Sequence, residues 1–249
     1  MMLMKTLMAA AVVTAGIGAA TAASAAVNLV QNGDFNAPGA DTPILLNGFS
    51  TFITGWTSTD TYTAYIPAGQ TPDQTWECCL LGSAGPGYAI KNGLVGPPSG
   101  DASVVLDGDP NYNNAGLYQK IGGLQSGKAY TLSFWYAGSQ EYSVGGPTTQ
   151  WFQVSLGDQA WDSPTMDVPS QGFFPWTKFS ATFTWDGIGD TLTFLAIGSP
   201  SGEPPFPMLA DVSLTAAVPE LSLWAMIVAG FAGLGFVARA RSKGMAGSA

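Results

Sequence analysis

The chain has 249 residues, with 17 acidic and 8 basic side chains, no histidine and two cysteines. Without histidine, catalytic triads and transition-metal sites built on imidazole are excluded. Residues 26–217 hold 16 acidic residues and four lysines, a net charge of 4 − 16 = −12, which is unfavourable for binding nucleic acid or anionic lipid.

The first 25 residues have the order of a secretory signal peptide. Lys5 is their only charge, a mostly apolar run follows from Leu7 to Ala20, and Ala23-Ser24-Ala25 supplies a small-residue cleavage motif. The run is shorter than the about 20 residues that a spanning helix needs. We therefore predict cleavage near Ala25 and export of the remainder.

Residues 26–217 predict one all-β domain. Glycine and proline separate short runs rich in β-branched and aromatic residues, and no 3.6-residue apolar stripe indicates a helix. Many short strands in one domain favour a β-sandwich of two antiparallel sheets. The predicted strands are residues 28–31, 49–56, 61–66, 102–106, 117–121, 128–136, 151–156, 176–185, 191–197 and 208–215.

Alternation within these strands predicts which side chains face the core. Positions 130, 132, 134 and 136 are apolar or aromatic, and so are 152, 154 and 156 and, in a third strand, 179, 181, 183 and 185. The opposite, otherwise polar faces then carry Trp135 in one strand and Trp151 with Gln153 in another. An aromatic ring flanked by hydrogen-bonding groups suits a sugar ring, so we predict glycan binding at Trp135, Trp151 and Gln153. Burial of both tryptophans is the alternative, because a one-residue register error exchanges the faces.

Other reactive side chains give weaker signals. The neighbours Cys78 and Cys79 cannot join distant strands, and a vicinal disulfide, pairing with another chain and free thiols stay open. Catalysis without histidine would need paired carboxylates or serine and lysine chemistry. Asp158, Asp162 and Asp167 cluster in sequence, but no spacing selects an acid and its partner. We therefore predict a protein that is not an enzyme.

Near the C-terminus, Leu221 to Ala238 form 18 consecutive uncharged, mostly apolar residues, followed by Arg239 and Arg241. This length can cross a bilayer, and no polar face can be drawn through it. Basic residues after an apolar span tend to stay in the cytoplasm. We predict a transmembrane helix at 221–238 in the inner membrane, with the domain outside the cytoplasm.

The same region resembles a known sorting signal. Pro219-Glu220, the apolar span and the arginines are similar to the PEP-CTERM signal of Gram-negative bacteria that make extracellular polysaccharide, over residues 218–243. The resemblance implies recognition by an exosortase in the inner membrane, processing near Pro219-Glu220, and transfer of the domain to the cell surface or exterior. The family's second proline is replaced by Leu221, and a short tail, 244–249, follows.

Several phrases of the domain resemble the galactose-binding-like jelly rolls that include many carbohydrate-binding modules. They are NLVQNGDF at 28–35, Gly-Trp at 55–56, DASVVLDG at 101–108, GKAYTLSF at 127–134 and LADVSL at 209–214. The resemblance implies a jelly-roll β-sandwich of eight or more strands whose first and last strands are neighbours.

That family often holds one structural Ca²⁺ where the N-terminal strand meets the C-terminal strand. Asn36 and Asp211 occupy the corresponding positions, while Ala210 stands where a further Asp is frequent. Ca²⁺ accepts amide and carboxylate oxygens, although fewer charges weaken its binding. The alternative is that Asp211 only ends a strand.

Together these features predict an exported, non-catalytic surface or extracellular-matrix protein that binds glycan, with exopolysaccharide as the partner. A surface hydrolase with paired carboxylates and a protein-binding adhesin are the alternatives.

Overall fold

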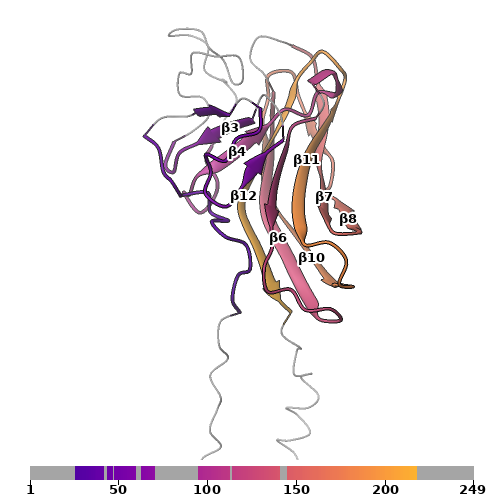
Figure 1. Cartoon of the computed structure of the whole chain (residues 1–249). Helices are drawn as coiled ribbons and strands as arrows, with labels where there is room; N and C mark the ends of the chain where they lie inside the picture. The colour runs from indigo at the N-terminus through magenta and orange to yellow at the C-terminus, as the bar shows by residue number, and fades with distance from the viewer. Residues whose placement is uncertain are drawn as a thin grey trace, which may run out of the picture.

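The computed structural model describes residues 26–41, 44–46, 48–59, 63–70, 95–112, 114–140 and 145–217. These residues form two antiparallel six-stranded sheets that face each other (Figure 1). Sheet A has the order β1-β3-β4-β12-β6-β10, and sheet B has the order β2-β5-β11-β7-β8, with β9 also paired to β7. The all-β sandwich predicted from the sequence is confirmed, and its topology is consistent with a jelly roll.

The elements in chain order are β1 (Ile44–Leu46), β2 (Thr57–Ser58), β3 (Thr63–Ile66), β4 (Ser103–Leu106), a 3-10 turn (Pro110–Tyr112), β5 (Gly116–Lys120), β6 (Ala129–Gln140), β7 (Thr148–Leu156), β8 (Gln159–Asp162), β9 (Met166–Val168), β10 (Phe174–Thr184), β11 (Thr191–Ser199) and β12 (Pro205–Ala216).

An aromatic cluster fills the space between the sheets. Phe134 of β6 stacks on Phe179 of β10 with ring centroids 4.8 Å apart, and it meets Phe194 of β11 edge-on at 5.0 Å. The even-numbered side chains of β6 from 130 to 136 and of β7 from 152 to 156 are buried, as alternation predicts. The predicted inward side chains 179, 181 and 183 of β10, and 185 directly after it, are only half-buried, because β10 is an edge strand of sheet A.

The two ends of the described domain lie side by side. Asn28 forms an isolated antiparallel bridge with Thr215, and the backbone N–H of Leu29 donates to the carbonyl of Leu214 at 2.8 Å. The predicted proximity of the first and last strands is therefore confirmed. Residues 28–31 form only this single bridge, however, and not a regular strand.

One predicted strand, 49–56, is wrong. This segment consists of bends and turns, and the strand that follows it is the two-residue β2. Gly48 and Gly55 have φ angles of 68° and 83°, which extended strands do not allow. Trp56 instead turns into the core, where its ring lies 5.4 Å from Phe35.

In the part of the chain that the structure describes, no helix is long and apolar enough to span a bilayer. The predicted signal peptide, the cysteine pair and the sorting signal with its span at 221–238 lie outside the described residues.

Candidate functional site

Trp135 and Trp151 lie on opposite outer surfaces of the sandwich. Trp135 belongs to β6 of sheet A, between the buried Phe134 and Tyr136, whereas Trp151 belongs to β7 of sheet B, beside the buried Phe152. Because side chains alternate along a strand, both tryptophans point away from the core and away from each other. Both are half-buried. The structure therefore does not bring the two predicted tryptophans into one site, but it does place Gln153 beside Trp151.

The Trp151 face is the outer surface of sheet B formed by Thr149, Trp151 and Gln153 of β7 and by the side chains paired with them. Ile197 of β11 lies directly opposite Trp151. On the other side, Asp162 of β8 pairs with Gln153, and Asp167 of β9 pairs with Thr149. Directly paired residues in an antiparallel sheet share a face.

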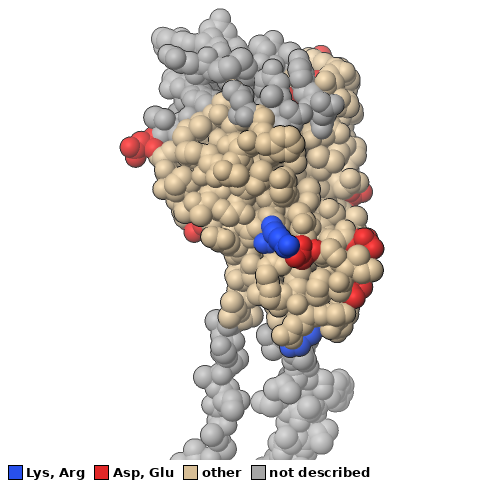
Figure 2. All heavy atoms as spheres, viewed as in Figure 1, with Lys and Arg blue, Asp and Glu red and all other residues tan. Residues whose placement is uncertain are grey.

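The polar groups of this face surround an apolar centre. Trp151 and Ile197 are half-buried, while Gln153, Asp162 and Asp167 are exposed. The hydroxyl of Thr149 donates to the Asp167 carboxylate at 3.1 Å, which fixes that acid at the rim. Figure 2 shows acidic atoms along the margin where Figure 1 places β8. An apolar platform ringed by donors and acceptors can bind a molecule with one apolar face and many hydroxyls.

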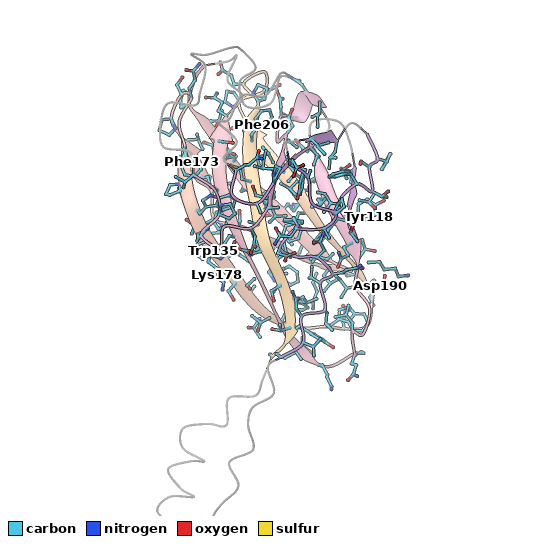
Figure 3. All side chains as sticks on the ribbon, turned by 90° about the vertical axis from the view of Figure 1, so that its left-hand side faces the viewer. Tyr118, Trp135, Phe173, Lys178, Asp190 and Phe206 are labelled. Atoms are coloured by element: carbon cyan, nitrogen blue, oxygen red, sulfur yellow. The ribbon has the colours of Figure 1, made fainter. Side chains whose placement is uncertain are left out.

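The Trp135 face is the outer surface of β10, β6 and β12. Trp135 lies between Lys178 of β10 and Ala210 of β12, and Figure 3 shows Trp135 next to Lys178 on this side. The next two outward-facing rows of paired residues across β10, β6 and β12 consist only of hydroxyl side chains. In one of these rows, Thr131 and Thr182 are hydrogen-bonded at 2.9 Å. These rows are Ser180, Ser133 and Ser213, then Thr182, Thr131 and Thr215.

Asn36 and Asp211, the predicted calcium residues, lie in one group with two acids that the sequence analysis missed. The Asn36 amide donates to the Asp34 carboxylate at 3.1 Å and to the Asp101 carboxylate at 2.8 Å. Its carbonyl oxygen accepts from the backbone N–H of Ala102 at 3.0 Å. Asn36 therefore holds two carboxylates in place, and its oxygen already accepts one hydrogen bond.

The electrostatics of this group centre on Asp211. Burial raises the pKa of the Asp211 carboxyl, the negative charges of Asp101 and Asp34 raise the pKa further, and a hydrogen bond from Ser99 acts in the opposite direction. Three neighbouring acids favour a cation by charge. Within the described residues, however, no three acidic or cysteine side chains converge closely enough to hold a metal ion. The donor types thus suit Ca²⁺, but their arrangement does not form a complete coordination shell.

The acids considered for catalysis spread along one edge of sheet B. Asp158 lies in the turn between β7 and β8, and Asp162 and Asp167 pair with β7 positions four residues apart. The Cα atoms of Asp162 and Asp167 are therefore about 13 Å apart along this edge. The outer face supplies these acids as hydrogen-bonding groups at a rim.

Comparison with known proteins finds no matching family model and no curated protein with a significant match. Solved structures with detectable similarity include a TmCBM61 structure in complex with β-1,4-galactotriose, at 13% identity and a TM-score of 0.41, covering 77% of this chain and 99% of that one. Another is the CBM22-1 xylan-binding domain of Paenibacillus barcinonensis Xyn10C, at 11% identity and a TM-score of 0.34, covering 71% and 97%. A third is a family 16 carbohydrate-binding module, at 17% identity and a TM-score of 0.33, covering 76% and 99%. These solved neighbours are carbohydrate-binding modules.

Sequence reasoning missed Asp34, Asp101, Ile197 and the roles of Asp162 and Asp167 as rim groups. Asp34 lies inside the NGDF phrase, two residues before Asn36, and Asp101 begins the DASVVLDG phrase. Both acids therefore lie in phrases that the sequence analysis had already noted, and they could have been considered as calcium residues. Ile197 reaches the Trp151 face only through the register of β11 with β7, which no local pattern states.

Proposed function

We propose that the chain is an exported, non-catalytic protein that binds a neutral glycan on its Trp151 face. The observation that carries the proposal is the position of Trp151, which is half-exposed on an outer sheet surface and paired with Ile197. A pyranose ring has an apolar C–H face that stacks on an indole, and its hydroxyls need donors and acceptors around that ring.

The chemistry of the rim favours a neutral sugar over an acidic one. Gln153 offers both a donor and an acceptor, and the Asp162 and Asp167 carboxylates accept hydrogen bonds from sugar hydroxyls. The same two charges repel a uronate. A sheet surface is also long enough for several sugars in a row, so the ligand is a polysaccharide chain and not a single residue.

The test is retention of the full-length chain on immobilised neutral β-galactan and on neutral exopolysaccharide from producing cells. Trp151→Ala should weaken binding by about tenfold or more, because the stacking platform is lost, and Gln153→Ala should weaken it less. Ile188→Ala is the control, since it removes an exposed apolar side chain, 54% accessible, that belongs to neither tryptophan face. Equal retention of the native chain and Trp151→Ala on every glycan would disprove the site.

A second part of the proposal concerns the predicted calcium. We infer that Ca²⁺ would be attracted by the carboxylates of Asp34, Asp101 and Asp211, with Asn36 orienting the first two. The charge of this group and the raised pKa of Asp211 support the inference. The ion would stabilise the junction of the two ends of the domain and would take no part in glycan binding.

The route of the protein is also proposed. Residues 1–25 would direct export, and residues 218–243, with Pro219, Glu220, Arg239 and Arg241, would hold the chain in the inner membrane until an exosortase-type enzyme processed it. The domain would then reach the cell surface or extracellular matrix. Mass spectrometry of both termini of the product made in its own cells tests this route: an end near residue 219 supports processing, and retention of Arg241 contradicts it.

A further inference from the structure

The Trp135 face carries an exposed basic side chain, whereas the charged side chains of the Trp151 face are acidic. Among the residues described in β10, β6 and β12, Lys178 is the one basic side chain, and it lies directly opposite Trp135. Lys178 is exposed, and the part of the chain that the structure describes gives it no carboxylate partner within salt-bridge distance. By contrast, Lys120 of β5 is paired with Asp190 at 3.4 Å.

From this contrast we propose that the Trp135 face is a second glycan site, which binds an acidic polysaccharide. The indole of Trp135 would stack on one sugar ring, and the Lys178 ammonium would pair with the carboxylate of a uronate, a charge-assisted hydrogen bond (Figure 3). A chain running along β6 would then meet the hydroxyl rows of Ser133 and Thr131. Hydroxyls donate and accept, so these rows suit the sugar hydroxyls on either side of the uronate.

Within the described residues, one group of acids lies beside this surface, on the side away from Lys178. Asp211 follows Ala210 in β12, and β12 is separated from β10 by β6. Two strand spacings amount to about 10 Å, and Asp34 and Asp101 belong to the same group as Asp211. Trp135 itself lies one strand spacing, about 5 Å, from Ala210. The field beside Trp135 therefore combines attraction by Lys178 on the β10 side with repulsion by these acids on the β12 side, both screened over about 8 Å at physiological ionic strength. The uronate is therefore expected on the β10 side of Trp135.

The experiment measures binding of polygalacturonate by the full-length chain. Lys178→Gln should weaken it by about tenfold, the loss expected for one hydrogen bond to a charged group, and rising salt should weaken the native complex in the same way. Because Lys178 is exposed, this variant should keep the native melting temperature. Lys120→Gln, which changes the net charge equally, and Trp151→Ala should both bind like the native chain.

The outcomes separate this site from the neutral-glycan site. Loss of polygalacturonate binding in Lys178→Gln and Trp135→Ala, with β-galactan binding intact, supports the proposal. Equal weakening by Lys178→Gln and Lys120→Gln would mean only general attraction of opposite charges and would overturn it. So would an unchanged affinity in Lys178→Gln, or sedimentation showing a dimer that this variant dissociates, because a second copy of the chain would then cover the face.

Discussion

At the scale of single residues, Trp56 shows how the loops contribute to the core. Its side chain is 1% exposed, its ring lies 6.1 Å from Phe194, and its indole N–H donates to the Asn32 carbonyl at 3.1 Å. Trp56→Ala should lower the free energy of unfolding by about 3 to 5 kcal/mol, because it leaves a cavity and an unpaired carbonyl. Denaturant titration measures this loss. Trp56→Phe, which keeps most of the packing, should lose clearly less, and an equal loss in both variants would argue against packing as the cause.

Asp211 should make stability depend on pH in the direction opposite to a salt-bridged acid. Its pKa is raised in the folded state by burial and by the neighbouring acids, so the folded chain binds a proton more tightly than the unfolded chain. The ionised Asp211 carboxylate therefore lowers the stability of the folded chain, and this loss is relieved as pH falls toward the folded pKa of Asp211. In the presence of a chelator, melting temperatures from about pH 7 to about pH 4 should fall more, or rise less, for Asp211→Asn than for the native chain.

The asparagine variant also tests the calcium proposal. Asp211 has φ 51°, a conformation that Asn adopts readily, so the backbone should be retained. If Ca²⁺ binds the folded chain, adding it at neutral pH should raise the melting temperature of the native chain but not that of Asp211→Asn. An unchanged native melting temperature would contradict a bound ion.

At the scale of elements, Gln119 of β5 fastens the N-terminal segment to sheet B. Its side-chain oxygen accepts from the Gln31 backbone N–H at 2.7 Å, and its amide donates to the carbonyls of Gln31 at 2.8 Å and Gly55 at 2.9 Å. One side chain thus replaces the ladder hydrogen bonds that a neighbouring strand would supply. Together with the hydrogen bonds from Leu29 to the Leu214 carbonyl and from Val212 to the Gly33 carbonyl, it keeps residues 29–35 in place without a regular strand.

Gln119→Met should therefore lower the free energy of unfolding by about 2 kcal/mol, because three backbone groups lose their partner while the side-chain volume is kept. Chemical denaturation gives the value. Gln153→Met, the same change on the exposed face of β7, should alter stability by about 0.5 kcal/mol or less. If the two variants lost the same stability, the hydrogen bonds of Gln119 would not stabilise the N-terminal segment.

The elements also show what the sequence could predict and what it could not. Alternation correctly assigns the faces of β6 and β7, because the twofold repeat of a strand acts within one segment. Trp151 and Gln153 were placed together for the same reason. The strand predicted at 49–56 fails because apolar residues in a glycine-flanked turn can be as buried as those of a strand. The sequence could not show that Trp135 and Trp151 lie on opposite surfaces, because this depends on which sheet each strand joins. It also could not place Asp167 beside Thr149, because this depends on the pairing of β9 with β7. Both arrangements are determined by contacts between segments far apart in the sequence.

At the scale of the whole molecule, the two candidate faces point in opposite directions and carry different charged side chains. If both proposals hold, one chain can bind a neutral and an acidic polysaccharide at the same time, because the sandwich core separates the two sites. The native chain should then retain soluble polygalacturonate on β-galactan beads. Trp151→Ala and Lys178→Gln should each abolish this retention, although each keeps one ligand. Retention by either single variant would show that the two polymers associate without the protein's two faces.

The meeting of Asn28 and Thr215 has a mechanical consequence. β12 leaves the domain at that end after pairing with β6 from Pro205 to Ala216 and with β4 at Met208 and Leu209. Tension applied through residue 217, while a polymer grips a sheet surface, would pull along the axis of β12. The hydrogen bonds between β12 and its neighbours would then be loaded in shear along the strand and not broken one after another from one end, so β12 as a whole resists extraction.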